Sequence, residues 1–92
     1  MAKILRANGD REDIEPMGEN GKLTLKQLQK VVGGWVEVVV VPDCHNLLIV
    51  DEDGKLKNLP VNVTASKVAQ TVIVGDVVLC SIVEVSNTND IE

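Results

Sequence analysis

The chain has 92 residues, enough for one small domain with one hydrophobic core and too few for two. Hydrophobic residues make up 45% of it, yet Trp35 is the sole aromatic residue, so valine must supply most of the core. A net charge of −5 argues against general binding to nucleic acid or to an anionic membrane surface, because both need clustered Lys and Arg.

Further classes of protein are disfavoured by what the chain lacks. No segment approaches the roughly 18 consecutive apolar residues that cross a membrane, and the first residues lack the apolar stretch of a signal peptide. We therefore expect a cytoplasmic protein. Cys44 and Cys80 stand in no CxxC motif or Cys/His cluster, so we expect two unpaired thiols rather than a disulfide or a metal site.

The N-terminal half predicts a strand followed by a short helix. The strand spans residues 2–7, and the polar, acidic residues 9–21 predict a loop or a short irregular strand. Thr24 and Gln27 have the spacing of a capping box at the start of the helix. Gly33 is expected to end the helix in the left-handed conformation.

Two apolar strands are predicted next. Residues 35–41 are apolar at nearly every position, which is typical of a strand covered on both faces. A turn then leads into a second strand over residues 47–50. The acidic run at 51–53 precedes Gly54, which we expect at a turn position with positive φ.

A second helix and a last strand complete the pattern. Asn62 or Thr64 caps the helix, and residues 72–85 form a strand with a kink at Gly75. We predict one α+β domain over residues 1–85 with a polar tail at 86–92. The order strand, helix, strand, strand, helix, strand is that of a split βαβ, or ferredoxin-like, arrangement with a small antiparallel or mixed sheet.

Four motifs in this order are similar to a known family. LTLKQLQKVVGGWVEVV, LIVDEDGKLKNLPVN, an alanine-bearing helix and VIVGDVVL resemble the domain of unknown function 3846, over residues 22–80. That family is spread through phages, prophages and bacterial mobile elements, and it commonly has Tyr where this chain has Trp35. The resemblance implies a small phage-encoded cytoplasmic accessory protein and no particular reaction.

Residues suited to catalysis are few. His45, the single histidine, stands beside Cys44 in a turn, where a Cys-His dyad lacks the support that an activated nucleophile requires. Asp51 begins a run similar to a calcium loop, but Asn62 stands where the closing bidentate Glu belongs. We therefore predict no catalytic residue, no metal site and no cofactor.

Several residues are candidates for binding. Glu37, a lone charge in an apolar strand, requires either a structural partner, Arg6 or a lysine, or a ligand. Trp35 is either a core anchor or a platform on which a base stacks. The start of the second helix offers N–H groups to an anion, or is simply capped. The predicted ligand-binding residues are Arg6, Trp35, Glu37, Asn62, Thr64 and Lys67.

Three lysines, Lys22, Lys26 and Lys30, recur every fourth residue, a spacing typical of a solvated helix face. The high apolar content of so short a chain indicates surface that a monomer cannot hide, so we expect a homo-oligomer.

The leading hypothesis is a non-enzymatic phage protein that sequesters a nucleotide-derived signal of host defence, either of the cyclic ADP-ribose type or a cyclic dinucleotide, at a homo-oligomer interface. One alternative is an inhibitor of a host defence protein, such as an acidic DNA mimic that uses carboxylates at residues 10–19 and 51–53. A small phosphodiesterase is the third.

Overall fold

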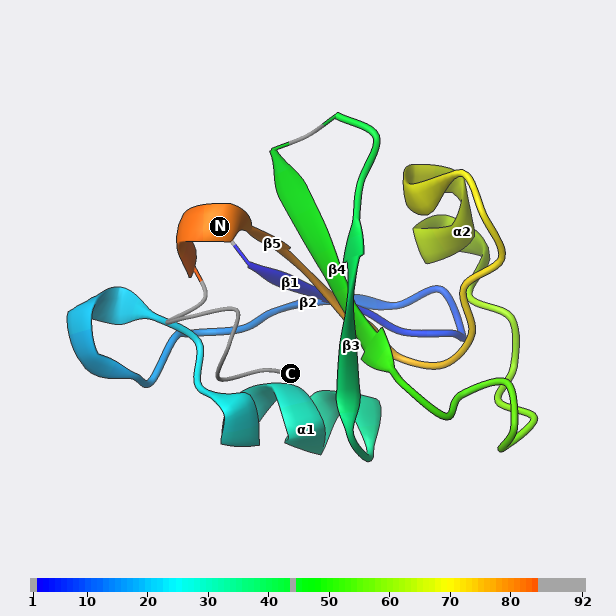
Figure 1. Ribbon diagram of the computed structural model, residues 1–92, viewed down its shortest axis with the longest axis horizontal. Helices are drawn as coiled ribbons and strands as arrows, with labels where there is room; N and C mark the ends of the chain where they lie inside the picture. The colour runs from blue at the N-terminus through cyan, green and yellow to red at the C-terminus, as the bar shows by residue number, and fades with distance from the viewer. Residues whose placement is uncertain (1, 44, 85–92) are drawn as a thin grey trace.

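The computed structural model describes residues 2–43 and 45–84, whose strands form one antiparallel sheet with a helix on each face (Figure 1). The order across the sheet is β2-β1-β5-β4-β3. The strands are β1 (Lys3–Leu5), β2 (Arg11–Asp13), β3 (Val36–Val40), β4 (Asn46–Asp51) and β5 (Val77–Ser81). The helices are α1 (Leu25–Val32) and α2 (Val63–Ala69), with short 3-10 turns at η1 (Glu19–Gly21) and η2 (Ile82–Glu84). The predicted α+β class is confirmed.

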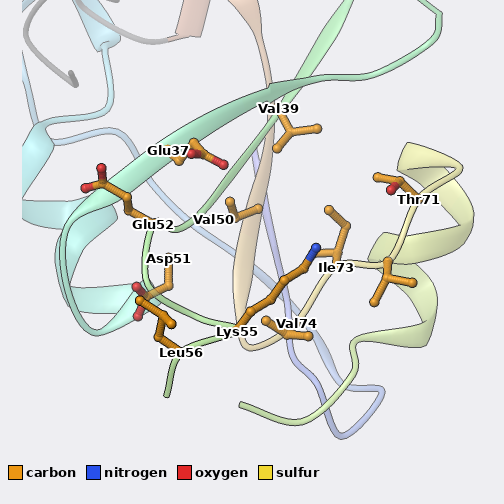
Figure 2. Close-up of a pocket in the computed structure, with 11 residues that line it drawn as sticks. Glu37, Val39, Val50, Asp51, Glu52, Lys55, Leu56, Thr71, Ile73 and Val74 are labelled. Carbon is orange, nitrogen blue, oxygen red and sulfur yellow. The ribbon is translucent and has the colours of Figure 1, made fainter. Parts of the chain in front are cut away.

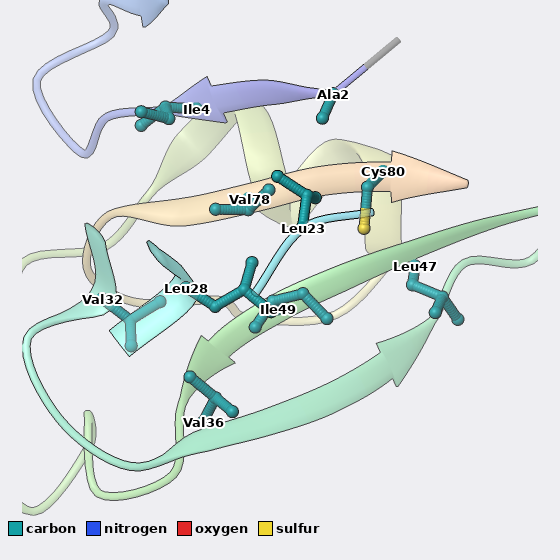
Figure 3. Close-up of a cluster of buried hydrophobic side chains, with 10 residues drawn as sticks. All are labelled: Ala2, Ile4, Leu23, Leu28, Val32, Val36, Leu47, Ile49, Val78 and Cys80. Carbon is teal, nitrogen blue, oxygen red and sulfur yellow. The ribbon is translucent and has the colours of Figure 1, made fainter. Parts of the chain in front are cut away.

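Side-chain alternation along β4 divides the core into two halves. Leu47 and Ile49 pack in the half covered by α1, whereas Leu48 and Val50 pack in the half covered by α2. Because β4 has a neighbour on each side and a helix on each face, every residue from Leu47 to the end of the strand is buried. Figure 3 shows the α1 half, formed by Ala2, Ile4, Leu23, Leu28, Val32, Val36, Leu47, Ile49, Val78 and Cys80.

The predicted split βαβ arrangement is wrong. In a βαβ unit the helix joins two parallel strands. Here α2 joins β4 to β5, which are direct antiparallel neighbours, and the remaining strand pairs in the sheet are antiparallel too. Residues 9–21, predicted as a loop or a short irregular strand, contain the short strand β2, which adds a strand to the predicted order. Helix α1 joins β2 to β3, which run in the same direction but lie at opposite edges of the sheet, so neither helix connects neighbouring parallel strands.

Helix α1 begins and ends where the sequence predicts. The Thr24 side chain accepts a hydrogen bond from the Gln27 backbone at 3.1 Å, and the Gln27 side chain accepts one from the Thr24 backbone at 3.1 Å. Gly33 has φ +86° and donates its N–H to Gln29 at 2.8 Å. This left-handed residue ends the helix and directs the chain toward β3.

Helix α2 depends on a buried capping residue. Asn62 caps it, as one of the two predicted alternatives, and its Oδ1 accepts a hydrogen bond from the Ala65 N–H at 3.0 Å. Its Nδ2 donates to the carbonyls of Leu5 at 2.8 Å and Gly75 at 2.9 Å. The side chain is completely buried, so one residue joins α2 to β1 and to the segment before β5.

Three predictions about the strands need correction. Residues 35–41 are not covered on both faces, because β3 is an edge strand on which Glu37 and Val40 are exposed. Gly54 is not among the described residues with positive φ; it is buried, and an added Cβ would lie 2.9 Å from Val74. The last strand is shorter than predicted, since the chain turns at Gly75, where φ is +77°.

Some predictions fall on residues outside the described ranges. These are the tail at 86–92 and the thiol of Cys44. Cys80 is buried in the α1 half of the core. None of the helices within residues 2–43 and 45–84 has the length and apolar character that crossing a membrane requires.

Replacing Asn62 tests this organisation. Asn62→Ala leaves two buried carbonyls and one helix N–H without their partner, so we expect the free energy of unfolding to fall by about 2–4 kcal/mol. Urea denaturation followed by circular dichroism measures it. Asn8→Ala is the matched control, because the Asn8 side chain bonds only across an exposed turn. A loss below about 0.5 kcal/mol is expected there, and an equal loss in both variants would contradict the role given to Asn62.

Candidate functional site

The six predicted binding residues do not form one site. Arg6 and Asn62 are engaged within the fold, Thr64 and Lys67 lie on α2, and Trp35 and Glu37 lie at or near the β3 edge. The structure therefore divides the prediction into separate places, each of which has its own surroundings.

Arg6 is held by two carboxylates. Its guanidinium donates to Glu12 at 2.8 and 3.2 Å and to Asp76 at 3.0 Å, and Asp76 also accepts from the Ala7 backbone at 2.9 Å. The hydrogen bond to Glu12 contributes most to raising the pKa of Arg6 above its ordinary value, against the opposing effect of burial. The predicted structural pairing of Arg6 is thus with these acids and not with Glu37.

The start of α2 has no spare polar group on its cap. Both ends of the Asn62 amide are used inside the fold, so of the two predicted roles for this residue, capping is the one observed. Thr64 is half-buried in the first turn, and Lys67 is exposed. With seven residues, α2 also aligns too few peptide dipoles to attract an anion strongly to its N-terminus.

Glu37 lies at the mouth of a hollow of about 290 Å³ between β3 and the segment before β5 (Figure 2). Figure 2 shows Val50 on its floor and Lys55 reaching across it toward Ile73. The lining residues are Glu37, Val39, Val50, Asp51, Glu52, Lys55, Leu56, Thr71, Val72, Ile73 and Val74.

This hollow is apolar inside and charged at its rim. Glu37, Glu52 and Lys55 are exposed, whereas the nearly buried carboxylate of Asp51 is paired with Lys57 at 2.7 Å. Across the described residues, no buried side-chain polar atom lacks a hydrogen-bond partner. The buried polar side-chain atoms of the hollow are therefore already satisfied within the fold, and its other charged groups lie exposed at the rim.

Trp35 lies in a second hollow, open to solvent and of about 470 Å³. Its side chain is 66% exposed, so the predicted alternative of a core anchor is wrong. The other lining residues are Lys26, Gln29 and Lys30 of α1, together with Gly34. We call these five residues the Trp35 platform.

The backbone of the platform is fixed by its neighbours. Glu52 donates its N–H to the Trp35 carbonyl at 2.9 Å, and the Lys57 ammonium donates to the Gly33 carbonyl at 3.5 Å. An added Cβ on Gly34 would lie 2.7 Å from that ammonium, so the close approach of Lys57 requires glycine. An exposed aromatic ring is thereby presented from a restrained segment.

The platform has local positive charge in an acidic protein. Lys26 and Lys30 lie one helical turn apart, and within the described residues neither has an ion-pair partner. The sequence showed the spacing of the two lysines but did not place them beside Trp35. The chain changes direction at Gly33, the left-handed residue that ends α1, and this turn brings Trp35 back to the lysines. The platform thus combines an aromatic ring with two ammonium groups.

Comparison with known proteins gives one result. Residues 3–91 match the family described as a domain of unknown function (DUF3846). No curated protein and no solved structure matches the chain. Because the match covers nearly the whole chain, the protein belongs to the DUF3846 family.

The ion pair between Arg6 and Glu12 predicts a pH dependence. The hydrogen bond from Arg6 lowers the pKa of Glu12 below its ordinary value of 4.5. A carboxyl group whose pKa is lowered by folding stabilises the fold at pH values above the pKa it has in the unfolded chain. This stabilisation is lost as the pH falls through the pKa of the folded state. We therefore expect Glu12→Gln to be less stable than the wild type at neutral pH, with a difference that disappears in acid.

Urea unfolding between pH 7 and pH 3 measures this difference. Glu15→Gln is the control, because the Glu15 side chain makes no ion pair with a described residue. A Glu12→Gln difference that is constant across the pH range would contradict the assignment.

Proposed function

We propose that this DUF3846 protein is a non-enzymatic binding protein that captures a nucleotide-derived signal on the Trp35 platform. In this proposal a base stacks on Trp35, and the phosphates lie against Lys26 and Lys30. The proposed setting is a phage protein in its bacterial host, where the signal belongs to host defence. Candidate ligands are of the cyclic ADP-ribose type or cyclic dinucleotides.

The observation that carries the proposal is the exposure of Trp35 beside two lysines that have no ion-pair partner among residues 2–43 and 45–84. A large aromatic side chain left 66% exposed retains most of its apolar area for a partner. Stacking of a base on an aromatic ring is worth about 1–3 kcal/mol. The ring therefore offers an affinity that does not depend on which base is bound.

The two lysines give the platform its preference for anions. A phosphate that contacts an ammonium group forms a charge-assisted hydrogen bond, which is stronger than a neutral one. The carbonyl end of α1 nearby carries partial negative charge, so the attraction must come from the side chains. Because the whole chain carries a net charge of −5, a small ligand fits this local positive patch better than a long polyanion does.

The acidic DNA mimic receives less support from the geometry. Such a mimic needs carboxylates that are free to meet a DNA-binding surface. Glu12 and Asp13 are paired with Arg6 and Lys3, and Asp51 is paired with Lys57. These pairs reduce the negative potential along both of the acidic segments.

The experiment that tests the proposal incubates the purified protein with cyclic dinucleotides and with ADP-ribose-derived signals. The free nucleotide and the material released by heat are then analysed by mass spectrometry. Depletion followed by recovery of the intact nucleotide supports capture. Recovery of an altered product would replace capture with an enzyme, and no depletion of any nucleotide would overturn nucleotide binding.

Substitution of Trp35 makes the proposal specific to the platform. Trp35→Leu should weaken binding of a captured nucleotide by about 1–3 kcal/mol, or roughly 5- to 150-fold, because the stacking surface is lost. The free energy of unfolding should change by less than about 1 kcal/mol, because the ring is mostly exposed. Calorimetric titration and urea denaturation measure the two quantities.

Two lysine variants separate the platform from general electrostatics. Lys30→Gln should weaken binding, whereas Lys67→Gln, an equal change of charge on the exposed surface of α2, should not. Equal losses in both variants would indicate attraction by total charge, and unchanged binding in Trp35→Leu would place the ligand elsewhere.

A further inference from the structure

Strands β2 and β3 form the two edges of the sheet (Figure 1), and their residues differ in chemistry. The β2 edge has three residues, all of them charged and exposed: Arg11, Glu12 and Asp13. The β3 edge reads Val36, Glu37, Val38, Val39 and Val40, with one charge in five residues. Natural sheets block their edges with short strands and charges, because an open edge is a template for another strand. One edge of this sheet is blocked in that way and the other is not.

The backbone groups at the open edge belong to three valines. Trp35 accepts a hydrogen bond from Glu52, and Val41 donates one to Asn46 at 3.1 Å, so the residues of β3 that bond to β4 are the odd-numbered ones. Hydrogen-bonded and non-bonded positions alternate along an antiparallel pair. The N–H and C=O groups of Val36, Val38 and Val40 therefore point away from the sheet.

We propose that the β3 edge pairs antiparallel with β3 of a second copy of this chain, about a two-fold axis at Val38. In this register Val38 faces Val38 of the second copy, and Val36 faces Val40 of the second copy. Each of these three facing pairs exchanges two hydrogen bonds, so all the outward groups of both strands are used. The result is one continuous sheet across the two copies.

The side chains favour this register for a second copy. On the α1 face every cross-strand pair is valine with valine, and Val40, 62% exposed in one chain, is placed beside the buried Val36. β-branched pairs of this kind stabilise antiparallel sheets. A strand with an unrelated sequence would match these positions only by coincidence, whereas a two-fold axis repeats the same match on both halves.

The one charge on the strand is compatible with this register. On the α2 face Glu37 is placed opposite Val39 of the second copy, and not opposite its Glu37. This register therefore avoids placing the two Glu37 carboxylates directly opposite each other, which would be destabilising. The inference does not depend on the ligand proposed above.

Proline at the edge tests the register. Val40→Pro removes one outward N–H and fills its place with a ring, without removing any hydrogen bond to β4. The matched control is Arg11→Pro. The bonds from Ile14 to Ala2 and from Arg6 to Asp10 show that the Arg11 N–H also points outward, on the blocked edge.

Light scattering during size-exclusion chromatography should give twice the 9.9 kDa chain mass for the wild type and for Arg11→Pro, and one chain mass for Val40→Pro. Circular dichroism checks that both variants are folded. A single-chain mass for the wild type at all concentrations up to the millimolar range would overturn the proposal and leave the edge to a strand of another protein. A folded Val40→Pro variant that remains dimeric would overturn it as well.

Amide hydrogen exchange in the wild type gives an independent reading that does not require any variant to fold. The N–H groups of Val36, Val38 and Val40 should exchange at least tenfold more slowly at high protein concentration than on dilution to the monomer. A dimer in which these three amides exchange at the same rate at both concentrations would use a different surface, and the proposal would fail.

Discussion

The buried amide of Asn62 is the interaction on which the packing of α2 against the sheet depends. It caps the start of α2 and donates hydrogen bonds to two carbonyls from other segments. One is that of Leu5 at the end of β1, 57 residues away, and the other is that of Gly75 in the turn before β5, 13 residues away. Because its three hydrogen bonds are inside the fold, losing any one leaves a buried polar group unpaired, which costs more than a typical surface bond contributes. The α2 layer is thin, with Ala65 and Ala69 as its buried helix residues, and so relies on this polar anchor more than α1 does.

The central position of β4 follows from the lack of aromatic side chains. A valine or leucine covers less area than an aromatic ring, so one sheet face and one helix would give a small core in a chain of 92 residues. Using both faces of β4 doubles the number of apolar side chains that one strand buries. This burial on both faces explains the unbroken apolar run of Leu47, Leu48, Ile49 and Val50. A strand with one face exposed to solvent would alternate apolar and polar residues.

The sequence predicted both ends of α1 and the cap of α2 because these features depend on residues close in the chain. Thr24 and Gln27 are three residues apart, Gly33 ends its own helix, and Asn62 caps the helix that follows it. Strand order depends instead on contacts across long separations, such as Arg6 with Asp76, 70 residues away. The same apolar pattern in residues 35–41 fits a central strand or an open edge, and only the pairing distinguishes them. Trp35 was singled out by composition, but its lysine neighbours come from a helix face that spacing assigns to solvent.

The segment from Gly33 to Trp35 connects the platform to the open edge. Asp51 at the end of β4 binds Lys57, and Lys57 reaches the carbonyl of Gly33, so the turn between α1 and β3 is held by the central strand. The carboxylate of Asp51 is 2% exposed, whereas Lys57 remains 41% exposed, which leaves the pair with one solvated partner and a smaller desolvation cost than a fully buried pair. A change in how β3 is paired would act on Trp35 directly, because Trp35 is the residue before the strand. The proposed ligand and the proposed strand pairing would therefore act on one restrained turn, in which Lys57 and Glu52 hold the carbonyls of Gly33 and Trp35.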